Sequence, residues 1–102
     1  MVEVNWTDQA LQDIDNIAEF ISKDSIKYAS IQSKLFFDKV EILTSLPEAG
    51  RIVPEIQKKK IRELILGNYR IVYRIISSKQ IDILTIHHSR RLIKNNPTLK
   101  KP

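Results

Sequence analysis

The sequence predicts one small α+β domain, built from an N-terminal strand, an antiparallel α-hairpin and a three-stranded antiparallel meander. Two consecutive segments before residue 47 repeat apolar side chains at the three- and four-residue spacing of an amphipathic helix. After residue 60 the chain changes to runs rich in Ile, Val, Leu and Tyr, which favour strands. A chain of 102 residues has room for one hydrophobic core. We therefore expect the order β-α-α-β-β-β within a single domain, residues 1–91, followed by a basic C-terminal tail, residues 92–102.

The first strand and the first helix are predicted at the N-terminus. Residues 2–6 are apolar enough for a strand, in which Trp6 is expected to pack under the helices. Thr7 supplies a side-chain oxygen that can cap a helix, and Asp8 lies in the first turn, where negative charge is favourable. Residues 23–25 are expected to end this helix, whose apolar face consists of Ala10, Leu11, Ile14, Ile17, Ala18 and Ile21.

A second, longer helix is predicted to follow at once. Pro47 and Gly50 are expected to end it, because proline cannot continue a helix. Two amphipathic helices with so short a connection predict an antiparallel α-hairpin. The second helix has a broad apolar side, made of Tyr28, Ile31, Leu35, Phe36, Val40, Ile42, Leu43 and Leu46.

Three strands are predicted at residues 61–66, 69–77 and 80–88. The dipeptides between them, Gly67-Asn68 and Ser78-Lys79, suit tight hairpin turns. The strands should therefore form a meander. The preceding segment is expected to be a polar loop, residues 51–60, that holds Pro54 and the run Lys58, Lys59 and Lys60.

Two-residue turns fix which residues of neighbouring strands lie opposite each other, and alternation along each strand then assigns every side chain to a face. One predicted face is apolar at its centre and is expected to pack against the α-hairpin: Arg62, Leu64, Leu66, Tyr69, Ile71, Tyr73, Ile75, Asp82, Leu84, Ile86 and His88. The other predicted face carries Ile61, Glu63, Ile65, Arg70, Val72, Arg74, Ile76, Ile81, Ile83, Thr85 and His87.

The second face holds a candidate site. Arg70 should lie directly opposite His87, while Glu63 should lie opposite Val72 and therefore diagonal to Arg70 and Arg74. Two helices can cover only one side of a small sheet, so we expect something other than these helices to cover the apolar residues of this face. Replacing Arg70 by alanine should then change the melting temperature little.

Charge is divided unevenly along the chain. Residues 1–50 contain 4 Lys/Arg and 9 Asp/Glu, a balance of −5, whereas residues 51–102 contain 13 and 3, a balance of +10. The basic half suits an anionic partner such as nucleic acid, a nucleoprotein or an acidic protein segment, or it forms a solvated surface. No segment has the length and apolarity of a membrane helix or the pattern of a secretory signal, and cysteine is absent. We expect a cytoplasmic protein.

Three stretches occur together in the second half of the chain: Arg62-Glu63-Leu64, Gly67-Asn68-Tyr69-Arg70-Ile71-Val72-Tyr73-Arg74 and Ile83-Leu84-Thr85-Ile86-His87-His88-Ser89-Arg90-Arg91. With residues 6–21 and the P-x-x-G-R step of residues 47–51, they resemble the RelE/ParE superfamily of bacterial type II toxin–antitoxin toxins, which includes plasmid stabilisation proteins. The resemblance is closer to the ParE branch. It implies an α-hairpin on one face of a sheet, a groove on the other face that an antitoxin segment wraps, and assembly into a toxin–antitoxin hetero-oligomer.

The resemblance implies two alternative targets. ParE-type members poison DNA gyrase without catalytic residues of their own, whereas RelE-type members are ribosome-dependent mRNA endoribonucleases. Arg70 matches the central-strand arginine of the nucleases, but their two strand lysines fall at Ile61 and Glu63. We therefore expect a ParE-like inhibitor of DNA gyrase, a binding module rather than an enzyme. The alternatives are a RelE-like mRNA endoribonuclease that uses Arg70, Glu63 and His87 as catalytic residues, and an inactive relative that retains antitoxin binding.

The expected partners are a cognate antitoxin and either DNA gyrase or the ribosome with its mRNA. Simpler interpretations stay open: Arg70 as a structural partner of Glu63, the lysines as a solvated loop, and the histidines as surface residues. Adjacent strand histidines point to opposite faces, so no metal site is expected, nor any cofactor. The residues predicted to contact target or antitoxin are Arg62, Arg70, Arg74, His88, Arg90, Arg91, Lys58, Lys59 and Lys60.

Overall fold

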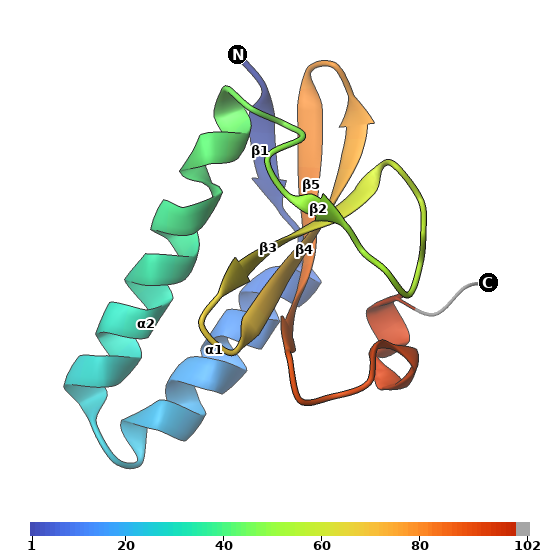
Figure 1. Ribbon diagram of the computed structural model, residues 1–102. Helices are drawn as coiled ribbons and strands as arrows, with labels where there is room; N and C mark the ends of the chain where they lie inside the picture. Colours follow the sequence, from blue (N-terminus) through green and yellow to red (C-terminus); the bar gives the residue numbers. More distant parts are fainter. Residues whose placement is uncertain (100–102) are drawn as a thin grey trace.

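The computed structural model describes residues 1–99, and the predicted tail residues 100–102 lie outside this range. The predicted order of strand, two helices and three strands is confirmed (Figure 1). The elements are β1 Glu3–Trp6, α1 Asp8–Ser22, α2 Ile26–Lys39, the 3₁₀ helix η1 Val40–Thr44, β2 Arg51–Ile52, β3 Ile61–Leu66, β4 Tyr69–Ser77, β5 Gln80–His88, and the 3₁₀ helices η2 Ile93–Asn95 and η3 Pro97–Leu99.

The strands form one mixed sheet in the order β1-β5-β4-β3-β2. The meander β3-β4-β5 is antiparallel as predicted, but β1 joins its edge in parallel, with Glu3 opposite Gln80. The short strand β2 lies inside the segment that was expected to be a loop, and it pairs Arg51 with Glu63. These two additions extend the predicted meander to five strands.

The first helix begins after its predicted cap, Thr7, and the second begins after a cap that was not predicted, Ser25. The Thr7 hydroxyl accepts a hydrogen bond from the Ala10 N–H at 3.2 Å, and the Ser25 hydroxyl accepts one from the Tyr28 N–H at 3.1 Å. The helices pack as an antiparallel hairpin on one face of the sheet (Figure 1). The hydrophobic core lies between the helices and the sheet and contains Ala10, Ile14, Phe36, Val40, Leu43, Leu64, Ile71, Tyr73, Ile81, Ile83 and Ile86. No helix within residues 1–99 combines the length and apolarity that a bilayer crossing requires.

The broad apolar side predicted for the second helix is only partly buried. Phe36, Val40 and Leu43 enter the core, because this side of α2 and η1 faces the sheet and α1. The remaining members are exposed, since one helix presents only one side to a single-layer sheet: Tyr28, Ile31, Leu35, Ile42 and Leu46. Trp6 packs as predicted under the helices, with its ring centroid 4.7 Å from that of Phe37.

A β-bulge in β5 changes the face on which part of this strand places its side chains, so the predicted assignment is wrong there. Val72 lies opposite Thr85 as predicted, but Tyr73 lies opposite Ile83, so Leu84 is an extra residue without a partner in β4. From that point the alternation is reversed. Ile81 and Ile83 are therefore buried in the helix-side core, whereas Asp82 and Leu84, which were expected there, are not members of it.

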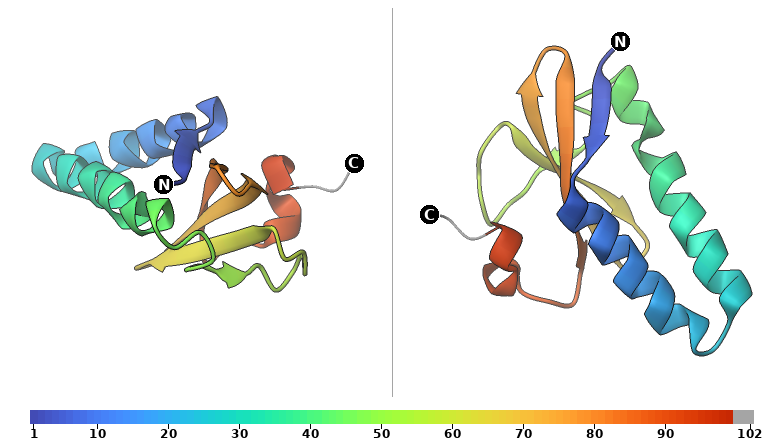
Figure 2. Two further views of the ribbon diagram at one scale, coloured as in Figure 1. Left: turned by 90° about the horizontal axis from the view of Figure 1, so that it is seen from above. Right: turned by 180° about the vertical axis from the view of Figure 1, so that it is seen from behind.

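As expected, the helices do not cover the second face of the sheet, but the centre of this face is not open to a partner, because other segments of the same chain cover it; Ile65, Arg74 and Ile76 stay exposed. Glu63, Arg70, Val72, Thr85 and His87 are all buried. The chain itself covers them with the loop that joins β2 to β3 and with the segment that follows β5, both of which lie away from the α-hairpin (Figure 2). Each covering segment places one apolar side chain in the interior, Val53 from the loop and Ile93 from the C-terminal segment.

Candidate functional site

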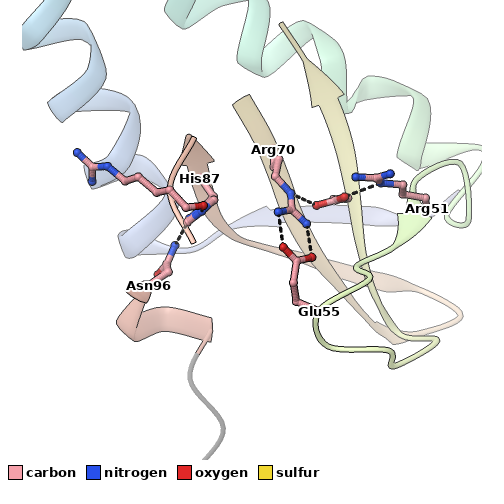
Figure 3. Close-up of polar contacts among 7 residues, drawn as sticks. Arg51, Glu55, Arg70, His87 and Asn96 are labelled. Atoms are coloured by element: carbon pink, nitrogen blue, oxygen red, sulfur yellow. Dashed lines mark hydrogen bonds and ion pairs between the residues drawn. The ribbon is translucent and has the colours of Figure 1, made fainter. Parts of the chain in front are cut away.

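The predicted pairing around the candidate site is confirmed. Arg70 lies opposite His87 and Glu63 lies opposite Val72, because the bulge falls beyond this part of β5. The side chains of Glu63 and Arg70 are hydrogen-bonded, as their diagonal placement predicted, whereas Arg70 and His87 have separate partners although they lie opposite each other. Arg70 extends toward the β2–β3 loop, whereas His87 extends toward the C-terminal segment (Figure 3).

Arg70 lies within a chain of alternating charges, Arg51–Glu63–Arg70–Glu55. Its Nε donates to Glu63 Oε1 at 2.5 Å, and its Nη1 and Nη2 donate to the two carboxylate oxygens of Glu55 at 2.7 and 2.8 Å (Figure 3). Glu63 also accepts from Arg51 Nε at 2.6 Å. Arg70 therefore forms a bidentate pair with one carboxylate and a second charge-assisted hydrogen bond with another.

The two ends of the charge chain, Arg51 and Glu55, are exposed, and its two middle members are buried. The exposed fractions of the side chains are 60% for Arg51, 0% for Glu63, 9% for Arg70 and 45% for Glu55. Hydrogen bonds from Arg70 hold the pKa of Glu55 at about 2, against an ordinary value of 4.5. The Glu55 carboxylate in turn raises the pKa of Arg70 above its usual range, so this guanidinium stays charged.

His87 is fixed on both sides of its ring. Its Nε2 lies 2.7 Å from the carbonyl oxygen of Arg91, which can only accept, so Nε2 carries the proton. Its Nδ1 lies 3.1 Å from the side-chain nitrogen of Asn96, which donates (Figure 3). The orientation of this amide is set by Thr98, whose backbone N–H donates to Asn96 Oδ1. Each ring nitrogen of His87 thus has a partner within the chain.

These contacts define what the cluster can do chemically. RNA cleavage requires a base that can accept a proton and cations that can contact the phosphate. In this arrangement Arg70 is paired with two carboxylates, Glu63 with two arginines, and His87 with a carbonyl and an amide. The geometry is that of a buried ion-pair network, which favours the structural interpretation of Arg70 and Glu63.

The remaining predicted contact residues of the sheet lie outside this network. Arg62 is half-buried on the helix side, where its Nη1 donates to the Gly50 carbonyl at 3.0 Å and its Nε to that of Lys59 at 2.9 Å. Arg74 is exposed opposite Ile61 and Asp82, and is not part of the charge chain. The three loop lysines, Lys58, Lys59 and Lys60, are exposed.

His88, Arg90 and Arg91 come together at a groove between α1 and the end of β5, which we term the α1–β5 groove. It has a volume of about 590 Å³ and is lined by Asp13, Asn16, Ile17, Phe20, Tyr69, Ile86, His88, Arg90 and Arg91. Phe20 is 70% exposed at its rim. The groove thus combines apolar walls with cationic side chains, an arrangement typical of surfaces that bind an acidic amphipathic segment.

Three residues of the two sites were not singled out from the sequence. Glu55 carried a usable signal, since it is the one acid among the cations of residues 51–60. Asp13 lies outside the predicted apolar face of its helix, yet its carboxylate accepts from the Ile86 N–H at 3.0 Å. Asn96 lies in the predicted tail, and no local pattern marks it.

Among residues 1–99, no group of three or more His, Asp or Glu side chains is arranged to hold a metal ion.

Comparisons with known proteins agree with this fold. The family model described as the ParE toxin of the type II toxin–antitoxin system, parDE, matches residues 4–93. Y4kP, a candidate toxin of Sinorhizobium fredii (strain NBRC 101917 / NGR234), is 34% identical over 90 residues, which are 86% of this chain and 88% of the relative.

A solved structure from the chromosomal ParDE toxin–antitoxin system of P. aeruginosa has a similar fold. Its TM-score is 0.71 at 23% sequence identity, and the match covers 86% of this chain and 96% of the other. The residues matched by the family model begin within β1 and end at the start of η2. The chain therefore belongs to the ParE toxin family of type II toxin–antitoxin systems.

Proposed function

We propose that this ParE family toxin inhibits DNA gyrase in the cytoplasm and is neutralised by a cognate antitoxin. The observation that carries the choice of target is the engagement of Arg70, Glu63 and His87 by partners inside the chain. A ribonuclease would need these groups to face a substrate. An inhibitor that acts by binding needs a surface instead, and exposed cations provide one.

The contact surface of this proposal is cationic. It consists of the α1–β5 groove with His88, Arg90 and Arg91, together with the exposed loop lysines Lys58, Lys59 and Lys60. Such a surface attracts an acidic protein region or a nucleoprotein complex over distances of about 10 Å at ordinary ionic strength. Residues 1–91 carry the groove and the loop, so we propose that they form the functional domain.

Purified toxin added to a gyrase supercoiling reaction tests the target. We expect supercoiling to be inhibited, and the same preparation to leave mRNA intact on translating ribosomes. The target assignment would be wrong if the message were cut while supercoiling continued.

The contact residues are tested by the double variant Arg90→Ala/Arg91→Ala in the same reaction. We expect weaker inhibition, because the two cations of the groove are removed while the core is left intact. Lys94→Ala is the matched control, since Lys94 is an exposed cation of the same C-terminal segment outside the groove. Equal inhibition by all three proteins would exclude the groove from target contact.

An antitoxin partner is supported by the family and by the ParDE system in which the similar structure occurs. The reading frame next to this gene should encode a small acidic protein. Co-expression of that protein is expected to restore growth and to co-purify with the toxin. Growth arrest that persists in its presence would contradict this part of the proposal.

A further inference from the structure

We propose that Arg70 is a carboxylate-binding site for an acidic segment of a protein partner, and that Glu55 occupies this site in the free protein. The proposal deepens the antitoxin-binding part of the proposed function and is independent of the gyrase target. It assigns Glu55 the role of an internal competitor for the Arg70 guanidinium.

The geometry of Arg70 provides one position for an external anion. Glu63 binds Nε from the interior and is itself fully buried, so it is fixed. The other two nitrogens, Nη1 and Nη2, point to the side from which Glu55 approaches. Because Arg70 is almost buried while Glu55 is 45% exposed, a partner reaches these nitrogens from solvent through the position of the Glu55 carboxylate.

The charge of the cluster specifies the kind of anion. Arg51, Glu63, Arg70 and Glu55 together are neutral, so the cluster without Glu55 carries one positive charge. One carboxylate restores neutrality, whereas a phosphate monoester brings about 1.5 to 2 negative charges. The planar pair of nitrogens matches the two oxygens of a carboxylate, as the present bidentate contact with Glu55 demonstrates.

The surroundings attract an acidic protein segment to this position. Lys58, Lys59 and Lys60 follow Glu55 in the same loop and are exposed, and Arg51 is exposed at the other end of the charge chain. Glu55 is the one acid within residues 51–60, so a segment that displaces it meets cations on the remainder of the loop. A run of acidic residues in a partner is the complement of this surface.

The loop that carries Glu55 is held to the sheet by few side chains. Val53 is buried and Ile56 is half-buried, but every other residue of 54–60 is exposed. The turn that presents Glu55 closes on itself, since the N–H groups of Ile56 and Gln57 donate to the Val53 carbonyl. Gln57 has a φ of 56°, a left-handed conformation that costs free energy in a residue with a side chain. These features favour local opening of the loop while the strands stay paired.

Internal competition has a measurable consequence. If the loop were closed at least nine-tenths of the time, the affinity of Arg70 for an external carboxylate would be reduced by a factor of about ten or more. Replacing Glu55 by glutamine keeps the shape of the side chain but removes its charge, so it weakens the competitor without removing packing. Affinity for an acidic segment should then increase.

The test is a titration of the full-length protein with a hexaglutamate peptide, followed by NMR through the Nε–H signal of Arg70. Glu55→Gln should bind the peptide at least about tenfold more tightly than the natural sequence does. Glu48→Gln is the matched control, because it removes the same charge from an exposed glutamate that pairs with Arg62 instead. Equal gains in the two variants, or a gain that leaves the Arg70 signal unmoved, would overturn the proposal.

A second measurement requires no substitution. Saturation of the natural protein with hexaglutamate at neutral pH should shift the NMR signal of the Glu55 carboxylate carbon, because this carboxylate loses Arg70 when it is displaced. An unchanged Glu55 carboxylate signal at saturation would refute displacement. Inorganic phosphate serves as the alternative anion, and tighter binding of phosphate than of the peptide would reject the carboxylate assignment. The supercoiling reaction tests the gyrase target separately. A failure of the gyrase proposal can therefore be distinguished from a failure of the proposed carboxylate site at Arg70.

Discussion

Asp13 of α1 accepts a hydrogen bond from the backbone N–H of Ile86 at 3.0 Å, so a helix side chain occupies part of the strand edge that β1 leaves unpaired. The same carboxylate accepts from the Thr85 hydroxyl. β1 pairs with residues 80–83 of β5 only. An unprotected edge strand is a template for pairing with another chain, and Asp13 blocks that pairing beyond β1.

Replacing Asp13 by alanine should therefore lower the free energy of unfolding by about 1–3 kcal/mol, because a buried donor loses its acceptor. Urea denaturation measures this loss. Asp15→Ala removes an exposed acid from the same helix and should change the free energy by no more than about 0.5 kcal/mol. Equal effects of the two substitutions would contradict the role of Asp13 at the edge.

Gly50 approaches the sheet too closely for a side chain. A Cβ at this position would lie 2.5 Å from the Glu63 carbonyl oxygen and 2.7 Å from a ring carbon of Tyr73. We expect Gly50→Ala to destabilise the protein by about 1–3 kcal/mol or more and to shift the ring signals of Tyr73 in NMR spectra. Gly67→Ala is the comparison, because its φ of 57° is unfavourable for alanine but nothing lies within 4 Å of the added carbon. That variant should leave the Tyr73 signals in place.

The burial of Arg70 reverses the effect that an uncovered face would predict. Arg70→Ala leaves the buried Glu63 without one of its two cations, and breaking such a pair costs about 3–5 kcal/mol. A large fall in melting temperature is expected. Lys34→Ala, which breaks the exposed pair with Asp38 on α2, should cost about 0.3–0.5 kcal/mol. A melting temperature unaffected by Arg70→Ala would show that the network contributes nothing to folding.

The free energy of unfolding should depend on pH through the ionisation of Glu55. Its pKa is lowered by Arg70 from 4.5 to about 2, so the folded protein holds this carboxylate ionised more strongly than the unfolded chain does. The resulting stabilisation is complete above pH 4.5 and is lost as the pH falls through about 2. We expect the difference in melting temperature between the natural protein and Glu55→Gln to shrink over this interval. A difference that stayed constant from neutral pH to pH 2 would contradict the ion pair.

Asn96 attaches the C-terminal segment to the sheet. It contacts Nδ1 of His87 at 3.1 Å and the Thr85 hydroxyl at 3.4 Å. Asn96→Ala should increase amide hydrogen exchange in residues 92–99 while the strands remain protected. Asn95→Ala changes an exposed neighbour and should leave exchange as it was. Equal amide exchange rates of residues 92–99 in the two variants would mean that Asn96 does not hold the segment.

The sequence predicted the strand pairing around Arg70 because short turns with characteristic residues fix the register. The bulge at Leu84 was not predicted, because the register of the two-residue turn was extended along the whole strand, although the apolar alternation changes phase between Ile83 and Leu84. The family resemblance and the helix cap at Thr7 were visible in the sequence and are confirmed, whereas the cap at Ser25 was not predicted.

The covering of the second face could not be predicted from periodicity. The β2–β3 loop and the C-terminal segment are short, polar and irregular, and they bury this face through single residues such as Val53, Glu55, Ile93 and Asn96. Such contacts depend on where the backbone goes after a turn, for which spacing along the sequence carries no signal.

The parallel pairing of β1 with β5 joins residues that are 77 positions apart, as in the contact of Asn5 with Asp82. The ribosome synthesises β1 first and its partner β5 almost last. The first strand therefore has no neighbouring strand while most of the chain is being made. The helices and the hairpins can form from local contacts, but closing the sheet requires this distant pairing, which slows folding. A truncated translation product that ends before Gln80 therefore cannot complete the sheet, and the cell is exposed to the finished toxin only at the end of its synthesis.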